Sequence, residues 1–102
     1  MVRHNHKLKT YAEFWPIYLK LHSKKGTQRL HVVGLLLGIG TLVTGLFLNH
    51  WGFLILAPLL GYGFAWFSHF FIEKNRPATW AYPWWSFISD FRMAILFLTG
   101  KL

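Results

Sequence analysis

Residues 30–72 read LHVVGLLLGIGTLVTGLFLNHWGFLILAPLLGYGFAWFSHFFI, and these 43 residues contain no Asp, Glu, Lys or Arg. A transmembrane helix needs about 20 consecutive apolar residues, so the stretch is long enough for two spans joined by a tight turn. Asn49-His50-Trp51-Gly52 supplies turn-forming residues near its middle. We therefore predict a transmembrane hairpin with spans at residues 30–48 and 52–72.

The composition of the whole chain agrees with a membrane protein. Hydrophobic residues make up 54% of the 102 residues and charged residues only 14%, against about 25% charged in an average soluble domain. So few charges cannot coat a small soluble protein, which argues against both a soluble enzyme and a soluble helical pair with a buried core. The absence of Cys excludes a disulfide scaffold, a thiolate metal site and a cysteine nucleophile. We expect one integral-membrane domain over residues 1–102.

The charged residues predict the orientation of the hairpin. Eleven Lys and Arg oppose three acidic residues, and the basic residues flank the two spans but are absent from the turn. Positive-inside statistics then place both termini in the cytoplasm, with a bacterial inner membrane as the expected location. This topology accounts for the basic excess, so no nucleic-acid partner is expected. Residues 1–10 are polar and basic, and we expect no removable signal peptide.

Two further helices are expected outside the spans. Thr10-Tyr11-Ala12-Glu13 matches a capping box at the start of an amphipathic helix over residues 10–24. Pro16 lies deep enough that this helix is expected to bend or to begin there. Residues 84–99 form a helix that is too short and, with Asp90 and Arg92, too charged for an ordinary span. We predict an interfacial or re-entrant helix, and hence an all-α membrane protein.

Three of the six histidines are expected at one end of the hairpin. His31 opens the first span, His69 lies near the end of the antiparallel second span, and His22 ends the preceding helix on the same side. Glu73 follows His69 by four residues and would share its helical face. Ionisable groups at membrane depth are costly and point to function. Imidazole and carboxylate groups without a thiolate favour a metal such as iron(II), zinc or manganese.

Small residues indicate which faces of the two spans meet. On the first span, small residues continue the face of His31 at spacings of three and four, which is the pattern of close helix contact in membranes. The second span carries a similar stripe that leads to His69. These stripes consist of Gly34, Gly38, Thr41 and Gly45 on the first span, and Pro58, Tyr62 and Ala65 on the second. We assign no chemical role to His4, His6 or His50.

Several short strings resemble a known family. The chain is similar from about Phe14 to Leu102 to the small bacterial branch of the Mpo-type membrane proteins, the 2-hydroxy fatty acid dioxygenase family. The strings are Phe14-Trp15-Pro16, Arg29-Leu30-His31, His69-Phe70-Phe71-Ile72-Glu73-Lys74-Asn75-Arg76-Pro77-Ala78 and Asp90-Phe91-Arg92-Met93. Two positions depart from the family pattern, since Thr27 stands where Asn is common and Ser68 where Gly usually precedes the His.

The resemblance implies an iron(II)-dependent α-oxidation. A 2-hydroxy fatty acid would react with O2, lose its carboxyl carbon and yield the acid one carbon shorter. We expect the iron ligands to be His22, His31 and His69, with Glu73 as a fourth ligand or as an acceptor that orients an imidazole. Arg29 and Arg76 are candidates to hold the substrate carboxylate or to anchor the chain to anionic lipid. A homodimer is plausible, because two spans rarely enclose a cavity alone.

Two other functions compete with the dioxygenase. The chain could be a non-catalytic membrane subunit or assembly factor whose histidines only pack, which metal analysis would test. It could also bind haem or a quinone, with His31 and His69 as axial ligands of the haem. A visible spectrum of the purified protein separates haem from iron held by protein ligands alone.

Overall fold

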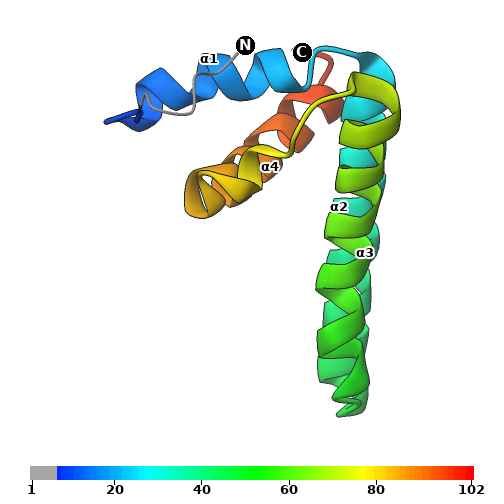
Figure 1. Ribbon diagram of the computed structural model, residues 1–102. Helices are drawn as coiled ribbons and strands as arrows, with labels where there is room; N and C mark the ends of the chain where they lie inside the picture. Colours follow the sequence, from blue (N-terminus) through cyan, green and yellow to red (C-terminus); the bar gives the residue numbers. More distant parts are fainter. Residues whose placement is uncertain (1–6) are drawn as a thin grey trace.

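The chain folds into an antiparallel helical hairpin with a platform at one end. The computed structural model describes residues 7–102. The hairpin consists of α2 (Lys25–Leu48) and α3 (Gly52–Ser68), and α1 (Tyr11–Leu21) and α4 (Pro83–Leu98) project sideways from its upper end (Figure 1). A π-helical turn, η1 (His69–Glu73), extends α3, and a 3-10 turn, η2 (Ala78–Trp80), precedes α4. The prediction of an all-α fold is confirmed.

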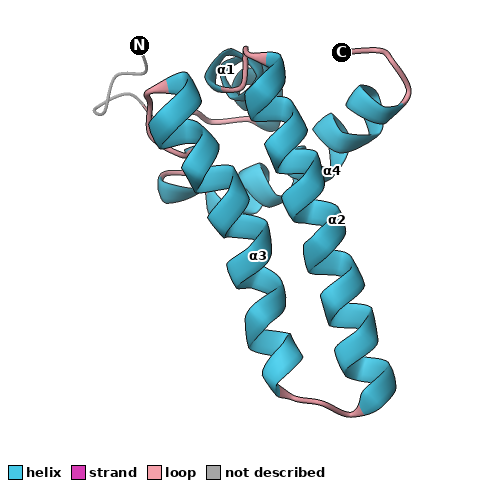
Figure 2. Cartoon of the chain, turned by 90° about the vertical axis from the view of Figure 1, so that its right-hand side faces the viewer, coloured by secondary structure: helices cyan, strands magenta, loops and turns pink. Residues whose placement is uncertain are grey.

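The two long helices pack through glycine, as the stripe on the first span predicts. They lie side by side along their length and are joined at the far end by a short loop (Figure 2). A Cβ atom added at Gly34 would lie 2.8 Å from the Cβ of Phe64, and one added at Gly45 would lie 2.4 Å from the Cβ of Phe53. Glycine therefore allows an approach of α2 to α3 that no larger residue permits.

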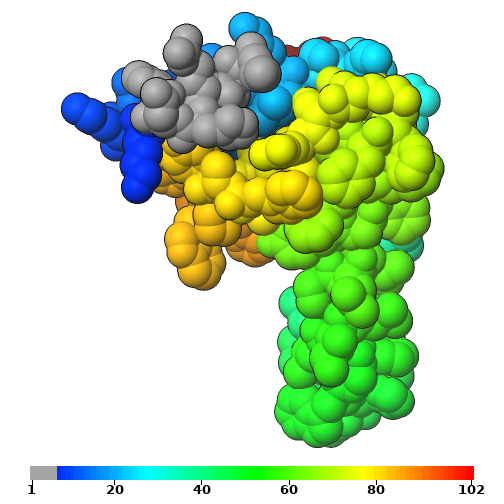
Figure 3. All heavy atoms as spheres, in the orientation of Figure 1, coloured from blue at the N-terminus to red at the C-terminus, as the bar shows by residue number. Residues whose placement is uncertain are grey.

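Two helices are long and apolar enough to cross a membrane: α2, and the continuous helix Gly52–Glu73 formed by α3 and η1. Only 22% of the most apolar window in each is buried. The lower half of the hairpin stands clear of the other elements (Figure 3), and Phe47 is 87% exposed there. These apolar surfaces have no protein to cover them within residues 7–102.

The platform is held by an aromatic core. Phe14 and Tyr18 of α1 are buried with Met93 of α4 and with Ala78 of η2. The predicted capping box at Thr10 is present, and α1 begins at Tyr11. The helix continues through Pro16 and does not begin there.

The helix bounds differ in two places from the expected spans. α2 begins at Lys25, five residues before the apolar stretch, because a lack of charge marks the membrane-compatible part of a helix and not its start. The second helix changes to π geometry from His69 to Glu73 and then ends at Lys74, which has a left-handed φ of 63°.

Candidate metal centre

Three buried imidazole rings meet where α1, α2 and η1 converge. His22 is the C-terminal cap of α1, His31 lies in the second turn of α2, and His69 begins η1. The Nε2 atom of His22 lies 3.0 Å from the Nε2 atom of His31 and 3.0 Å from that of His69. All three residues are buried, at 1%, 7% and 1% exposure. The structure thus brings together the three histidines that the sequence singled out.

Two of these rings are oriented by their own helices. His22 Nδ1 lies 2.6 Å from the carbonyl oxygen of Tyr18, and His31 Nδ1 lies 2.9 Å from that of Thr27, in each case four residues earlier. A carbonyl oxygen only accepts hydrogen bonds, so each Nδ1 carries the hydrogen and each Nε2 presents a lone pair.

A side-chain amide orients the third ring. His69 Nδ1 lies 2.7 Å from Oδ1 of Asn75, and the Nδ2 group of Asn75 donates to the carbonyl oxygen of Leu21 at 3.1 Å. The second bond fixes which side of the amide faces the imidazole. His69 therefore also carries its hydrogen on Nδ1, and Asn75 links this ring to the end of α1.

Three Nε2 lone pairs consequently point at one another with no hydrogen atom between them. This arrangement is repulsive unless a cation lies among them, and the three nitrogen atoms lie within 4.8 Å of one another. Burial, followed by the neighbouring His31 and His69, holds the pKa of His22 well below its ordinary value, so His22 is neutral and available as a ligand. The donor set fits a metal that accepts imidazole nitrogen.

Glu73 is not brought to the three nitrogen atoms. Its carboxylate accepts hydrogen bonds from the Ser23 hydroxyl at 3.2 Å and from the Lys24 backbone N–H at 2.7 Å. Glu73 ends the π turn that His69 begins, and its carboxylate is directed to the start of α2. Glu73 instead places negative charge at the N-terminus of α2, where the helix dipole favours it.

The two candidate arginines also lie away from the rings. Arg29 and Arg76 are exposed, and neither lines the cavities beside the histidines. His50 lies in the turn at the far end of the hairpin, against the ring of Phe53. His4 and His6 fall outside the described residues.

Asp90, to which the sequence assigned no part in the reaction, lies beside the three histidines. Its Oδ1 accepts a hydrogen bond from the Tyr18 hydroxyl at 2.5 Å, and it lines two cavities that His31 also lines. Burial raises the pKa of Asp90 to about 7, against the opposing effect of the Tyr18 hydrogen bond. Arg92, a nearby cation of α4, lies over the ring of Trp15 at 4.0 Å. An acid within an otherwise apolar helix was the signal available in the sequence.

Ser68, one of the two departures from the family pattern, contacts the site directly. Its hydroxyl donates to the carbonyl oxygen of Ala65 at 2.6 Å and lies 3.2 Å from His31 Nδ1. Because the Ser68 hydroxyl hydrogen is donated to Ala65, its oxygen acts as an acceptor toward His31. The Nδ1–H group of His31 is thus shared between this oxygen and the carbonyl oxygen of Thr27. The serine therefore adds a second acceptor behind the His31 ring.

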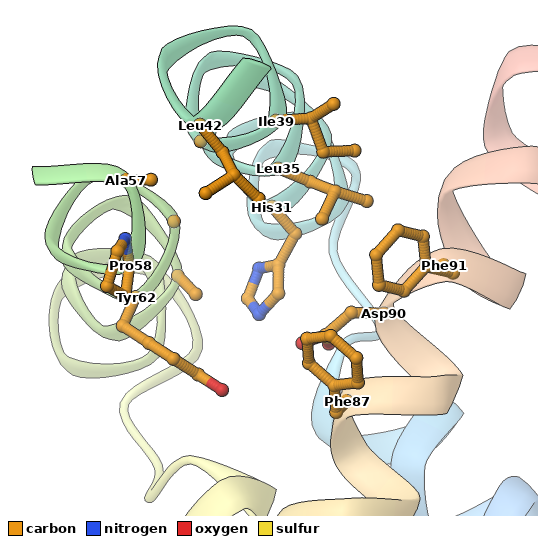
Figure 4. Close-up of a pocket in the computed structure, with 13 residues that line it drawn as sticks. His31, Leu35, Ile39, Leu42, Ala57, Pro58, Tyr62, Phe87, Asp90 and Phe91 are labelled. Carbon is orange, nitrogen blue, oxygen red and sulfur yellow. The ribbon is translucent and has the colours of Figure 1, made fainter. Parts of the chain in front are cut away.

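A mainly apolar groove opens beside the metal centre. It has a volume of about 220 Å³ and is bounded by α2, α3 and α4. Figure 4 shows the His31 ring and the Asp90 carboxyl group pointing into it, with Leu35 and Leu42 along one wall and Pro58 along another. The centre is thus connected to an apolar channel on the hairpin side of the platform.

Comparisons with known proteins place this architecture in a family. The searches of curated proteins and of solved structures each gave no significant match. Residues 8–102 match the family described as 2-hydroxy-palmitic acid dioxygenase Mpo1-like, and this range includes the three histidines, Asn75 and Asp90. Because the match spans nearly the whole sequence, the chain belongs to the Mpo1-like 2-hydroxy-palmitic acid dioxygenase family.

Proposed function

We propose that this protein is an iron(II)-dependent dioxygenase that converts a 2-hydroxy fatty acid into the acid one carbon shorter. The observation that carries the proposal is the convergence of three neutral imidazoles from three helical elements, with their lone pairs directed at one point. Membership of the family supplies the reaction class. Imidazole nitrogen without thiolate suits iron(II) in oxygen chemistry.

The residues of the chain have separable tasks in this proposal. Bound iron(II) would supply the redox chemistry by which O2 attacks the 2-hydroxy acid. His22, His31 and His69 would hold the metal, and the acceptors at their Nδ1 atoms keep each ring in the required tautomer. Asp90, held by Tyr18, borders the space in front of His31. The apolar groove walls would exclude water around the reacting end of the substrate.

The oxygen-uptake experiment tests the reaction. Protein purified without oxygen and loaded with iron(II) should consume O2 with 2-hydroxypalmitate and release the acid one carbon shorter. Palmitate should react poorly, because a site that binds a substrate hydroxyl discriminates strongly against its absence. The His22→Ala variant should lose both iron and activity, whereas His50→Ala should keep both. No oxygen uptake by iron-loaded protein with any 2-hydroxy acid would refute the dioxygenase.

We also propose that the hairpin spans the membrane, with α1, α4 and the metal centre at the cytoplasmic end. The exposed apolar side chains of the lower hairpin support insertion, and basic residues such as Lys24, Lys25 and Arg29 lie at the platform end. In this arrangement α4 is interfacial, with Trp84 and Ile88 exposed toward lipid. A cysteine introduced at Asn49 should react only with reagent added outside, and one at Lys101 only with reagent added inside.

The geometry favours iron held by protein ligands alone over haem. An axial pair of His31 and His69 would need a porphyrin plane between them, and the His22 Nε2 atom already lies 3.0 Å from both. The iron-loaded protein should therefore lack a Soret band, and an intense Soret band after purification would overturn this assignment.

A further inference from the structure

The groove beside the metal centre has one polar end and a long apolar remainder. His31 and Asp90 line one end, and the α2 wall continues from His31 through Leu35 and Ile39 to Leu42. At about 1.5 Å per residue, the distance along α2 from His31 to Leu42 is roughly 17 Å. This shape matches an extended molecule with a polar head and an apolar tail.

The opposite walls complete an apolar channel. Ala57 and Pro58 of α3 face the far part of the groove, and Phe87 and Phe91 of α4 cover its side (Figure 4). Binding sites for apolar ligands combine such walls with a few polar groups that fix orientation. Here the polar groups include His31, which belongs to the metal centre itself, so a ligand in the groove would present its polar end to the metal.

We propose that the groove holds the first part of the substrate's acyl chain, with the 2-hydroxy carboxylate at the His31 end. This inference rests on the proposed function and names the part of the chain that the protein recognises. A cavity of about 150 Å³ accommodates the six carbons of benzene, so about 220 Å³ holds roughly nine carbons. The rest of a sixteen-carbon chain then extends into the surroundings of the hairpin.

The protein should therefore sense chain length only over the carbons that lie in the groove. Methylenes that pack against the groove walls should each raise kcat/KM, up to about nine carbons. Further methylenes should add nothing, because they touch the same apolar surroundings in free and bound substrate.

Two matched variants test this on one helix. Leu42→Trp fills the far end of the groove, whereas Leu36→Trp places the same ring on a side chain that is 53% exposed and outside the groove. Variant-to-wild-type ratios of kcat/KM cancel the partitioning of the substrate into membranes. For Leu42→Trp the ratio should stay within twofold for 2-hydroxyvalerate and fall roughly tenfold for 2-hydroxypalmitate. For Leu36→Trp it should remain near one for both.

A crosslinking experiment provides a readout without turnover. Iron-loaded protein without oxygen is irradiated with 2-hydroxypalmitate that carries a diazirine at carbon 8 or at carbon 14. The carbon-8 probe should label the peptides that contain Ile39 or Ala57, and Leu42→Trp, or the smaller Leu42→Phe, should reduce this labelling. The carbon-14 probe should label mainly lipid or detergent.

The outcomes separate this inference from the proposed function. Groove labelling without oxygen uptake would support the groove and refute the dioxygenase. Oxygen uptake with equal ratios for Leu42→Trp and Leu36→Trp would refute the groove alone. Carbon-8 labelling confined to lipid, or to the exposed face of α2 around Leu36, would also refute the groove.

Discussion

The two ends of the α2/α3 hairpin are built from opposite kinds of side chain. At the platform end polar residues are buried beside the aromatic core, and they include His22, Thr27, His31, Ser68 and His69. At the turn end large apolar residues are exposed instead, namely Phe47 at 87%, Leu48 at 63% and Trp51 at 69%. One end thus encloses polar groups in protein, and the other depends on its surroundings to cover apolar surface.

This contrast shows why the platform exists. Buried imidazole groups are costly without hydrogen-bond partners, and α1 supplies both His22 and the carbonyl oxygen that orients it. Neither α1 nor α4 reaches the lower hairpin, where packing relies on glycine contacts such as Gly45 against Phe53. Changes to the histidines and to their hydrogen-bond partners at the platform end should therefore alter metal binding, and changes at the turn end should alter only stability.

The largest expected effect comes from removing two ligands. The affinity for iron(II) should fall in the double variant His31→Ala, His69→Ala. The fall should exceed the roughly 10- to 100-fold loss that removal of an outer hydrogen-bond partner causes. Competition with a coloured chelator measures the affinity. His50→Ala, at the opposite end of the hairpin, should bind iron as the wild type does. Full iron retention by the double variant would remove the basis for the metal centre.

The next effect separates orientation from ligation. Asn75→Ala deletes the acceptor at His69 Nδ1 and the link to Leu21, so iron affinity should fall about 10- to 100-fold. Asn49→Ala alters the turn end, where Asn49 has a left-handed φ of 55°. It should cost about 1–2 kcal/mol of stability and leave iron affinity unchanged. Equal iron affinity in both variants would contradict the role given to Asn75.

The sequence was sufficient to predict the helical hairpin and the convergence of the three histidines at one end of it. The charge-free stretch over residues 30–72 and the antiparallel direction of its halves required His31 and His69 to share one end, and the glycine spacing predicted the contact face. Each of these inferences depends on a local period or on helix length, which the amino-acid order encodes directly.

The rest of the site depends on tertiary contacts that no periodic pattern in the sequence indicates. The Glu73 carboxylate accepts hydrogen bonds from Ser23 and from the Lys24 N–H at the start of α2, a tertiary contact that its four-residue spacing from His69 does not predict. Asp90 reaches the site because α4 folds back beneath α1, a tertiary relation that its own helix does not predict. Asn75 becomes a partner of His69 only after the chain reverses at Lys74.

A third pair of variants tests the glycine contact on its own. Gly34→Ala places a Cβ 2.8 Å from that of Phe64 and 3.0 Å from the carbonyl oxygen of Gly61, so it should lower stability by about 1–3 kcal/mol. Gly40→Ala meets no atom within 4 Å and should raise stability by up to about 1 kcal/mol through helix propensity. Unfolding in detergent micelles measures both. Equal effects would show that the helices do not approach as closely as described.

The smallest expected effect decides whether Glu73 caps α2, as its hydrogen bonds indicate, or is an iron ligand. As a cap of α2, its carboxylate accepts from Ser23 and from the Lys24 N–H, so Glu73→Ala should cost about 1 kcal/mol of stability. Glu73→Gln keeps an acceptor oxygen and should cost less. Neither variant should lower iron affinity tenfold, because the carboxylate lies with the α2 terminus and not with the imidazoles. A tenfold or greater loss of iron in Glu73→Gln at unchanged stability would instead make Glu73 a ligand.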